Sequence, residues 1–264
     1  MKLLSPKEIV NYASESAMEK GKYNIKKILI LSFLAGSYIA MGGLLSVLVG
    51  FGFPGFSENN PALSKFLMGA TFPIGLILVV LAGGELFTGN CAYFIPNVMS
   101  KRQPWKTAFR NWGLVWSGNF IGALFFAYFL VYIPHTLHYE PWRTALENLA
   151  NSKMSNPFFV TFCKGVGANW MVCLAMWLGM SSKDTMGKIA GIWWPVMTFV
   201  AIGYEHCIAN MFFIPMAMLE GADINIIDFF VKNLIPSTLG NIAGGAIFVG
   251  GFYWFVYEKL AKKD

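Results

Sequence analysis

The sequence predicts an all-α integral membrane protein, in which six transmembrane helices form two inverted three-helix repeats and spans two and five are interrupted. Three observations predict this fold: the composition, the lengths of the apolar stretches, and an internal repeat. Of the 264 residues, 56% are hydrophobic and only 13% are charged. This is more apolar surface than an ordinary soluble domain carries, so the chain belongs to the membrane class.

Six apolar stretches are long enough to cross a hydrocarbon core, which takes about 20 apolar residues. Four of them are continuous and run over residues 28–53, 111–133, 157–182 and 234–257. The other two, residues 66–100 and 189–219, are each broken near the middle by a polar cluster. We predict that these are spans two and five, each interrupted at its polar cluster.

The first 27 residues are charged and lack the apolar core of a signal peptide, so we expect no cleaved leader. Residues 5–8, with the sequence SPKE, are typical of a helix capping box with proline in the first turn. We predict an amphipathic helix over residues 5–20 on the membrane surface, with a plain solvated tail as the alternative. We expect residues 1–264 to form one transmembrane domain, with repeat halves at about 28–133 and 157–257.

Lysine and arginine are distributed unevenly between alternate loops, and this asymmetry predicts the orientation. Fifteen of the 20 lie on the side that holds both chain ends, only four lie on the other side, and Lys164 falls inside a span. We therefore expect a multi-pass protein of the cell membrane with both termini in the cytoplasm. The net charge of +6 follows from this topology. No basic run is interleaved with stacking aromatic residues, so we expect no nucleic-acid partner.

An internal repeat relates the two halves of the chain. The sequence ELFTGN at residues 85–90 matches EHCIAN at 205–210, at an offset of 120. The sequence NWGLVWSGNFIG at residues 111–122 matches NLIPSTLGNIAG at 233–244, at an offset of 122. Each copy holds three spans, so the second must enter the membrane from the opposite face, as in the inverted repeats of many transporters. The two breaks are equivalent, and paired breaks of this kind line a pore or binding site.

Strongly polar residues are few inside the spans, and most lie in the two breaks. In chain order they are Glu85, Thr88, Asn90, Lys164, Asn169, Glu205, His206 and Asn210. A charge at the bilayer centre costs about 2.5–3.5 kcal/mol on insertion scales, so each one needs a partner or a task. Because Glu85 and Glu205 are equivalent, we predict that both accept hydrogen bonds from backbone N–H groups freed by the breaks. Asn90 and Asn210 also match, and we predict a structural role for them.

His206 has no counterpart, because Leu86 stands at the equivalent position of the first repeat. A difference between matched repeats favours a functional role, and a hydrogen-bonded core histidine is the alternative. It is the only histidine inside a span, and the four cysteines form no CxxC pair. The sequence HTLH at residues 135–138 lies in an outer loop without further ligands. We therefore expect no metal site, no disulfide and no cofactor.

The polar residues favour a site for small anions. Half-helices starting at about Asn90 and Ile208 would point the positive ends of their dipoles inward, and Lys164 would add positive potential if span four packs nearby. Apolar side chains surround this point, so a full charge would meet a steep desolvation barrier. We predict that His206 shares or hands over a proton to a weak-acid anion, which then crosses as the neutral acid.

Four motifs resemble those of the formate/nitrite transporter family. They are GGELFTGN in span two, KGVGANWMVCLAMW in span four, GYEHCIANMFFIPM in span five and NLIPSTLGNIAGG in span six. The resemblance covers all six spans. It implies an aquaporin-like protomer with its own pore in a homopentamer. It also implies passage of formate, nitrite, hydrosulfide or similar anions, and IANMFFIPM is most similar to the formate-transporting branch.

The resemblance also implies roles for individual residues. It assigns the central histidine to His206, its neighbouring glutamate to Glu205, and the facing threonine to Thr88. It places the family's span-four asparagine at Asn169, and Lys164 stands where many members carry a lysine. The implied hydrophobic constrictions are Phe72 and Phe199 on the outer side and Leu76, Leu86 and Val172 on the inner side.

Two alternatives stay open beside a formate channel. The first is a channel of the same family whose main substrate is nitrite or hydrosulfide. The second is an intramembrane enzyme that uses His206 and Glu205, but no serine or cysteine with its own base and no metal-ligand set supports catalysis. We therefore predict that the protein is not an enzyme. A single NPA at residues 60–62 lies in a loop outside both breaks and does not indicate a true aquaporin.

Overall fold

The computed structural model describes residues 3–57 and 59–262, so the predicted domain ends, residues 1 and 264, lie outside the described part. All regular elements of the described residues are helices, and six are long and apolar enough to cross a membrane. The predicted all-α fold with six spans is confirmed. The spans are Ile25–Phe51, Pro61–Gly83, Trp105–Tyr132, Phe158–Ser181, Thr185–Ile202 and Ile226–Lys259.

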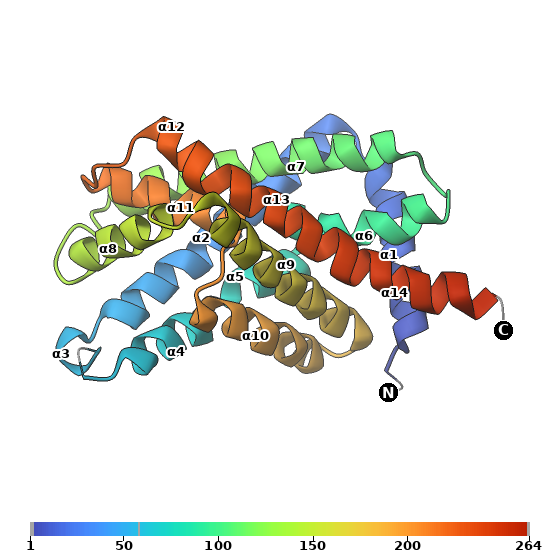
Figure 1. The fold of residues 1–264 in the computed structure, drawn as a ribbon, viewed down its shortest axis with the longest axis horizontal. Coiled ribbons are helices and arrows are strands. Elements are labelled where there is room, and N and C mark those ends of the chain that lie inside the picture. Colours follow the sequence, from blue (N-terminus) through green and yellow to red (C-terminus); the bar gives the residue numbers. More distant parts are fainter. Residues whose placement is uncertain (1–2, 58, 263–264) are drawn as a thin grey trace.

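The α-helices keep the labels of Figure 1. They are α1 (Pro6–Gly21), α2 (Ile25–Phe51), α3 (Pro54–Ser57), α4 (Pro61–Thr71), α5 (Ile74–Leu78), α6 (Phe87–Met99), α7 (Trp105–Phe125), α8 (Trp142–Met154), α9 (Phe158–Ser181), α10 (Thr185–Ile202), α11 (Cys207–Leu219), α12 (Ile226–Asp228), α13 (Ile235–Ala243) and α14 (Phe252–Trp254). Wider π-helical stretches extend or join several of them. These stretches are Val79–Gly83, Phe126–Tyr132, Phe229–Leu234, Gly244–Gly251 and Phe255–Lys259, and a 3-10 turn, Leu260–Lys262, ends the last span.

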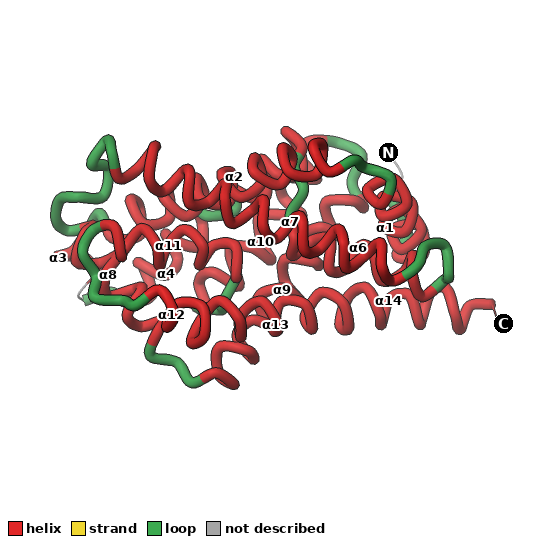
Figure 2. Tube along the Cα trace, turned by 90° about the horizontal axis from the view of Figure 1, so that it is seen from above, coloured by secondary structure: helices red, strands yellow, loops and turns green. Residues whose placement is uncertain are grey.

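Both chain ends lie at the end of the molecule that holds α1, and α3, α8 and α12 lie at the opposite end (Figures 1 and 2). An even number of spans requires this arrangement. The closest helix pairs are α2 with α7 and α9 with α13. At each crossing a glycine faces a backbone carbonyl of the other helix: Gly122 faces Phe33, and Gly240 faces Phe162. A Cβ at either glycine would overlap that oxygen, so only glycine permits this approach.

The second and fifth spans are interrupted at the predicted breaks. The first half of each span ends at a glycine in the left-handed region, with a φ of 94° at Gly83 and 81° at Gly203. Residues with a Cβ seldom adopt this conformation. The backbone then runs extended at Leu86 and at His206 before a half-helix begins. Each interrupted span therefore consists of a longer helix, an extended break and a buried half-helix.

The half-helices α6 and α11 begin at Phe87 and Cys207, earlier than the predicted starts at Asn90 and Ile208. The difference is three residues in the first break and one in the second. Asparagine side chains from the third and sixth spans accept the first helical N–H groups, so the helices start before the polar residues that mark the breaks in the sequence. The start predicted at about Ile208 is therefore met within one residue, whereas the start predicted at about Asn90 is three residues too late.

Helices α1 and α8 precede the two repeats in the same way, since α1 leads into α2 and α8 leads into α9. Ser5 caps α1 in a full capping box with Glu8. The apolar face of α1, including the fully buried Ala13 and Ala17, belongs to the hydrophobic core, and α1 packs against α6. Sequence analysis treats residues 134–156 as an outer loop and misses α8, whose Leu146 is also fully buried.

Candidate functional site

Asn119 on α7 holds the first break together with three hydrogen bonds. Its side-chain Nδ2 donates to the carbonyl oxygens of Ser32 at 2.8 Å and Glu85 at 2.9 Å. Its Oδ1 accepts the N–H of Phe87, the first residue of α6, at 3.0 Å. One buried amide therefore satisfies backbone groups on both sides of the break, where the bilayer offers no water.

Asn241 on α13 holds the second break in the same way. Its Nδ2 donates to the carbonyls of Gly165 at 2.8 Å and Glu205 at 2.9 Å. Its Oδ1 accepts the N–H of Cys207, the first residue of α11, at 2.8 Å. The two breaks are thus built alike, as the repeat in the sequence requires.

A lysine and an asparagine contact the buried carboxylate of Glu85, and a second asparagine holds the first one. Lys20 of α1 forms an ion pair with it, and Asn90 Nδ2 donates to it at 2.7 Å. The same Nδ2 donates to Asn111 Oδ1 at 2.8 Å. The cluster joins α1, the first break, α6 and α7.

The carboxylate of Glu205 has the same surroundings in the second repeat. Lys153 of α8 pairs with it at 3.1 Å, and Asn210 Nδ2 donates to it at 2.6 Å and to Asn233 Oδ1 at 2.7 Å. Both glutamates therefore bond to side chains, and the prediction that they accept the freed backbone N–H groups is wrong. Asn119 and Asn241, from other spans, accept the backbone N–H groups at the starts of the half-helices. The carboxylates are therefore available to pair with the lysines.

Sequence analysis singles out Lys164 and overlooks Lys20 and Lys153. Lys164 Nζ donates to Asn156 Oδ1 at 3.1 Å and is not the ion-pair partner of Glu205. Its repeat mate, 133 positions earlier, is Leu31, and both residues accept a hydrogen bond from a break glutamate N–H through their carbonyl oxygens. The sequence does contain a signal for the two missed lysines. Each lies near the end of the helix that precedes its repeat, Lys20 in α1 and Lys153 in α8.

The two half-helices meet at Thr88 and His206. Thr88 Oγ1 lies 3.0 Å from His206 Nε2, and both residues are buried. His206 is also the N-cap of α11, because its Nδ1 accepts the N–H of Ala209 at 3.1 Å. This bond needs the lone pair of Nδ1, so the network assigns the ring proton to Nε2. The ring is then neutral and donates to Thr88.

Asn169 lies behind this pair and contacts the backbone. Its Nδ2 donates to the carbonyl of Thr88 at 3.0 Å and to that of Asn241 at 2.6 Å. The thiol of Cys173 approaches the Thr88 carbonyl and Asn169 Oδ1, each at 3.5 Å. Asn169 therefore positions Thr88 by fixing the first turn of α6.

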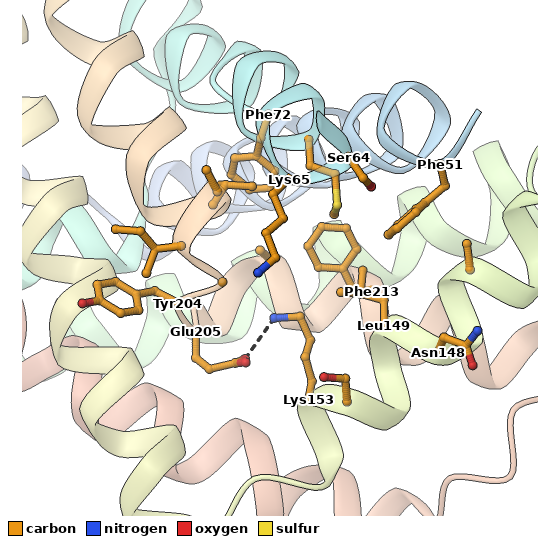
Figure 3. Close-up of a pocket in the computed structure, with 18 of the residues that line it drawn as sticks. Phe51, Ser64, Lys65, Phe72, Asn148, Leu149, Lys153, Tyr204, Glu205 and Phe213 are labelled. Carbon is orange, nitrogen blue, oxygen red and sulfur yellow. Dashed lines mark hydrogen bonds and ion pairs between the residues drawn. The ribbon is translucent and has the colours of Figure 1, made fainter. Parts of the chain in front are cut away.

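Two cavities lead toward the breaks. The α8-side cavity has a volume of about 780 Å³ and is lined by residues of α4, α8, α10 and the second break, including Glu205 and His206. The α1-side cavity has a volume of about 650 Å³ and is lined by residues of α1, the first break and the start of α10, including Glu85 and Leu86. Lysines outnumber acids in both linings, so each cavity attracts anions. These lysines are Lys65, Lys153 and Lys164 in the first and Lys20, Lys183 and Lys188 in the second. Figure 3 shows the α8-side cavity with its Lys153–Glu205 ion pair.

Apolar side chains separate the two cavities. Phe72 and Phe199 line the base of the α8-side cavity and meet edge to face, with ring centroids 5.9 Å apart. Phe199 also stacks on His206 at 5.8 Å. Leu86 lines the other cavity, whereas Leu76 and Val172 line neither. All five of the predicted constriction residues are 2% exposed.

A family model described as formate/nitrite transporter matches residues 7–255. The chain belongs to the formate/nitrite transporter family. It is 44% identical to a probable formate transporter of Methanothermobacter thermautotrophicus over 97% of each chain. It is 37% identical to a formate channel of Bacillus thuringiensis over 96% of each chain. The resemblance predicted from the four motifs is confirmed.

Two solved structures of this family share the fold. An ion channel of the family aligns with a TM-score of 0.86 and 29% identity, over 94% of this chain and 98% of the other. A pentameric formate channel with formate bound aligns with a TM-score of 0.76 and 33% identity, over 88% and 97%. The protein is therefore a multi-pass membrane protein of a transporter family and not an enzyme.

Proposed function

We propose that the protein is a channel for small monovalent weak-acid anions, and formate in particular, in the cell membrane. Its relatives include proteins named as formate transporters and channels. We also propose a homopentamer with one pore in each subunit, because a similar solved structure is a pentameric formate channel. The asymmetry of basic residues supports a cytoplasmic location for both termini and the α1-side cavity.

One observation carries this proposal: the Thr88 and His206 pair stands in an apolar constriction between two cavities rich in lysine. Formate would enter a cavity by attraction to the lysines. At the narrow point it would meet the hydroxyl of Thr88 and the Nε2–H of His206, which exchanges its bond to Thr88 for one to formate. A carboxylate oxygen needs such donors when it leaves water. The apolar side chains on both sides oppose passage of a full charge, so the neutral acid should cross them more easily.

The proton that accompanies formate has two possible sources. Handover from His206, as predicted from the sequence, requires a charged ring with protons on both nitrogens. Nδ1 would then point a donor at the N–H of Ala209, and the cap of α11 would break with each turnover. The geometry favours the other source, in which formate takes its proton from hydronium in the aqueous solution that reaches the cavity. His206 then stays neutral and offers its Nε2 proton to formate as a hydrogen-bond donor.

Uptake into proteoliposomes tests the choice of substrate. We expect the purified protein to raise the uptake of labelled formate at least about tenfold over protein-free liposomes, and nitrite or hydrosulfide uptake to rise less. Formate has the carboxylate shape that the Thr88 and His206 donors can hold. Formate uptake equal to that of empty liposomes, with rapid nitrite or hydrosulfide uptake, would contradict the formate assignment and leave an anion channel of the same family.

A further inference from the structure

The α8-side cavity is far larger than formate requires. Its volume is about 780 Å³, which lies in the range of about 300–1,000 Å³ typical of sites for drug-sized molecules. Formate has only three non-hydrogen atoms. The wall above the base is largely apolar and includes Phe51, Met68, Leu149 and Phe213. The apolar part of a larger molecule could therefore pack on this wall, whereas formate alone would leave the wall in contact with water.

Two ammonium groups in this cavity pair with no carboxylate of the residues that the structure describes. Lys65 forms no ion pair with the residues that the structure describes, and Lys164 bonds only to the amide of Asn156. Lys153, by contrast, is held by Glu205. In Figure 3 the side chains of Lys65 and Lys153 extend into the cavity from opposite walls, with their ammonium ends toward the same space. Like charges brought together in this way favour an anionic occupant.

Two phenylalanine rings pack together at the His206 end of the cavity. Phe72 and Phe199 meet edge to face there, and each is 2% exposed. A carboxylate attached to an aromatic ring could reach the lysines but would not pass between these side chains. It would remain in the cavity and occupy the route to His206.

We propose that the α8-side cavity binds amphipathic monocarboxylates such as aryl carboxylic acids, with the carboxylate at Lys65, on the side that faces Lys153, and the ring on the apolar wall. A bound molecule blocks entry to the constriction from this side. The binding site needs only the cavity and its lysines. The consequence for formate flux rests on the proposed function.

Isothermal titration of the purified full-length protein with cinnamate tests the binding site. We expect cinnamate to bind, and cinnamyl alcohol, which has the same shape without the charge, to bind at least about tenfold more weakly. Lys65→Met should raise the dissociation constant for cinnamate about tenfold, and Lys65→Arg should restore much of the affinity. Lys232→Met is the matched control, since Lys232 lies outside the cavity, is half-exposed and pairs with Asp228.

The inference is overturned if cinnamate does not bind, or if the alcohol binds equally well. It is also overturned if Lys65→Met and Lys232→Met have the same affinity as the wild type. A second experiment measures formate uptake in proteoliposomes with and without cinnamate. We expect cinnamate to lower the uptake rate of the wild type and to lower that of Lys65→Met much less. Intact binding without any formate uptake would count against the proposed function and leave this site standing.

Discussion

Asn241→Ala is expected to lose at least about 3 kcal/mol of folding stability. The substitution removes both donors and the acceptor that bond Gly165, Glu205 and Cys207. Each buried backbone group left without a partner costs about 1–3 kcal/mol, and no water replaces the lost bonds at this depth. Thermal unfolding of the purified protein in detergent measures the effect as a lower melting temperature and a lower yield of folded protein.

The matched control for this variant is Asn148→Ala. Asn148 is exposed in the α8-side cavity and forms no hydrogen bond with the residues that the structure describes. We expect its melting temperature to equal that of the wild type. Asn119→Ala, which removes the equivalent bonds from the first break, should behave like Asn241→Ala. Equal melting temperatures for all three variants would show that the asparagines do not hold the breaks.

Lys153→Met should be more harmful than the loss of an exposed lysine, because the side chain of Lys153 is only 12% exposed. Among the described residues it leaves the carboxylate of Glu205, which is 2% exposed, with the donors of Asn210 and Asn233. Removal of one partner from a buried ion pair costs about 3–5 kcal/mol, because the remaining charge stays desolvated. The double variant Lys153→Met with Glu205→Gln should recover most of this loss, since neither charge remains.

Lys164→Met controls for the loss of a lysine in the same cavity. Its ammonium bonds only to an amide, so we expect a small change in melting temperature. If the double variant at Lys153 and Glu205 is as unstable as the two single losses added together, the pair is not coupled. The repeat predicts the same pattern for Lys20 and Glu85 at the other break.

The repeat in the sequence was enough to locate the centre of the site. Matching ELFTGN with EHCIAN placed both breaks at equivalent depth and singled out His206 as the residue without a counterpart. The structure puts that histidine against Thr88, where the two half-helices meet. The composition and the lengths of the apolar stretches also predicted the six spans, because a helix must have a minimum apolar length to cross a bilayer.

Other parts of the site could not be predicted in this way. The helix α8 and the partners of the two glutamates depend on contacts between segments 52 to 65 residues apart. The helices α1 and α8 lie outside the matched motifs, and Lys20 and Lys153 appear in the sequence only as charges outside the spans. The tautomer of His206 depends on the N–H of Ala209, which becomes available only because α11 begins at Cys207.

The pH dependence of formate uptake by the wild type and His206→Asn tests the central claim most directly. Carboxylic acids titrate near pH 4, so uptake of the neutral acid should increase as the pH falls. If His206 is a neutral donor, the asparagine variant should be slower but should keep this increase toward acidic pH. An uptake rate in His206→Asn that no longer changes with pH would contradict the neutral donor and restore proton handover by His206. A rate and pH profile identical to those of the wild type would remove His206 from the pore altogether.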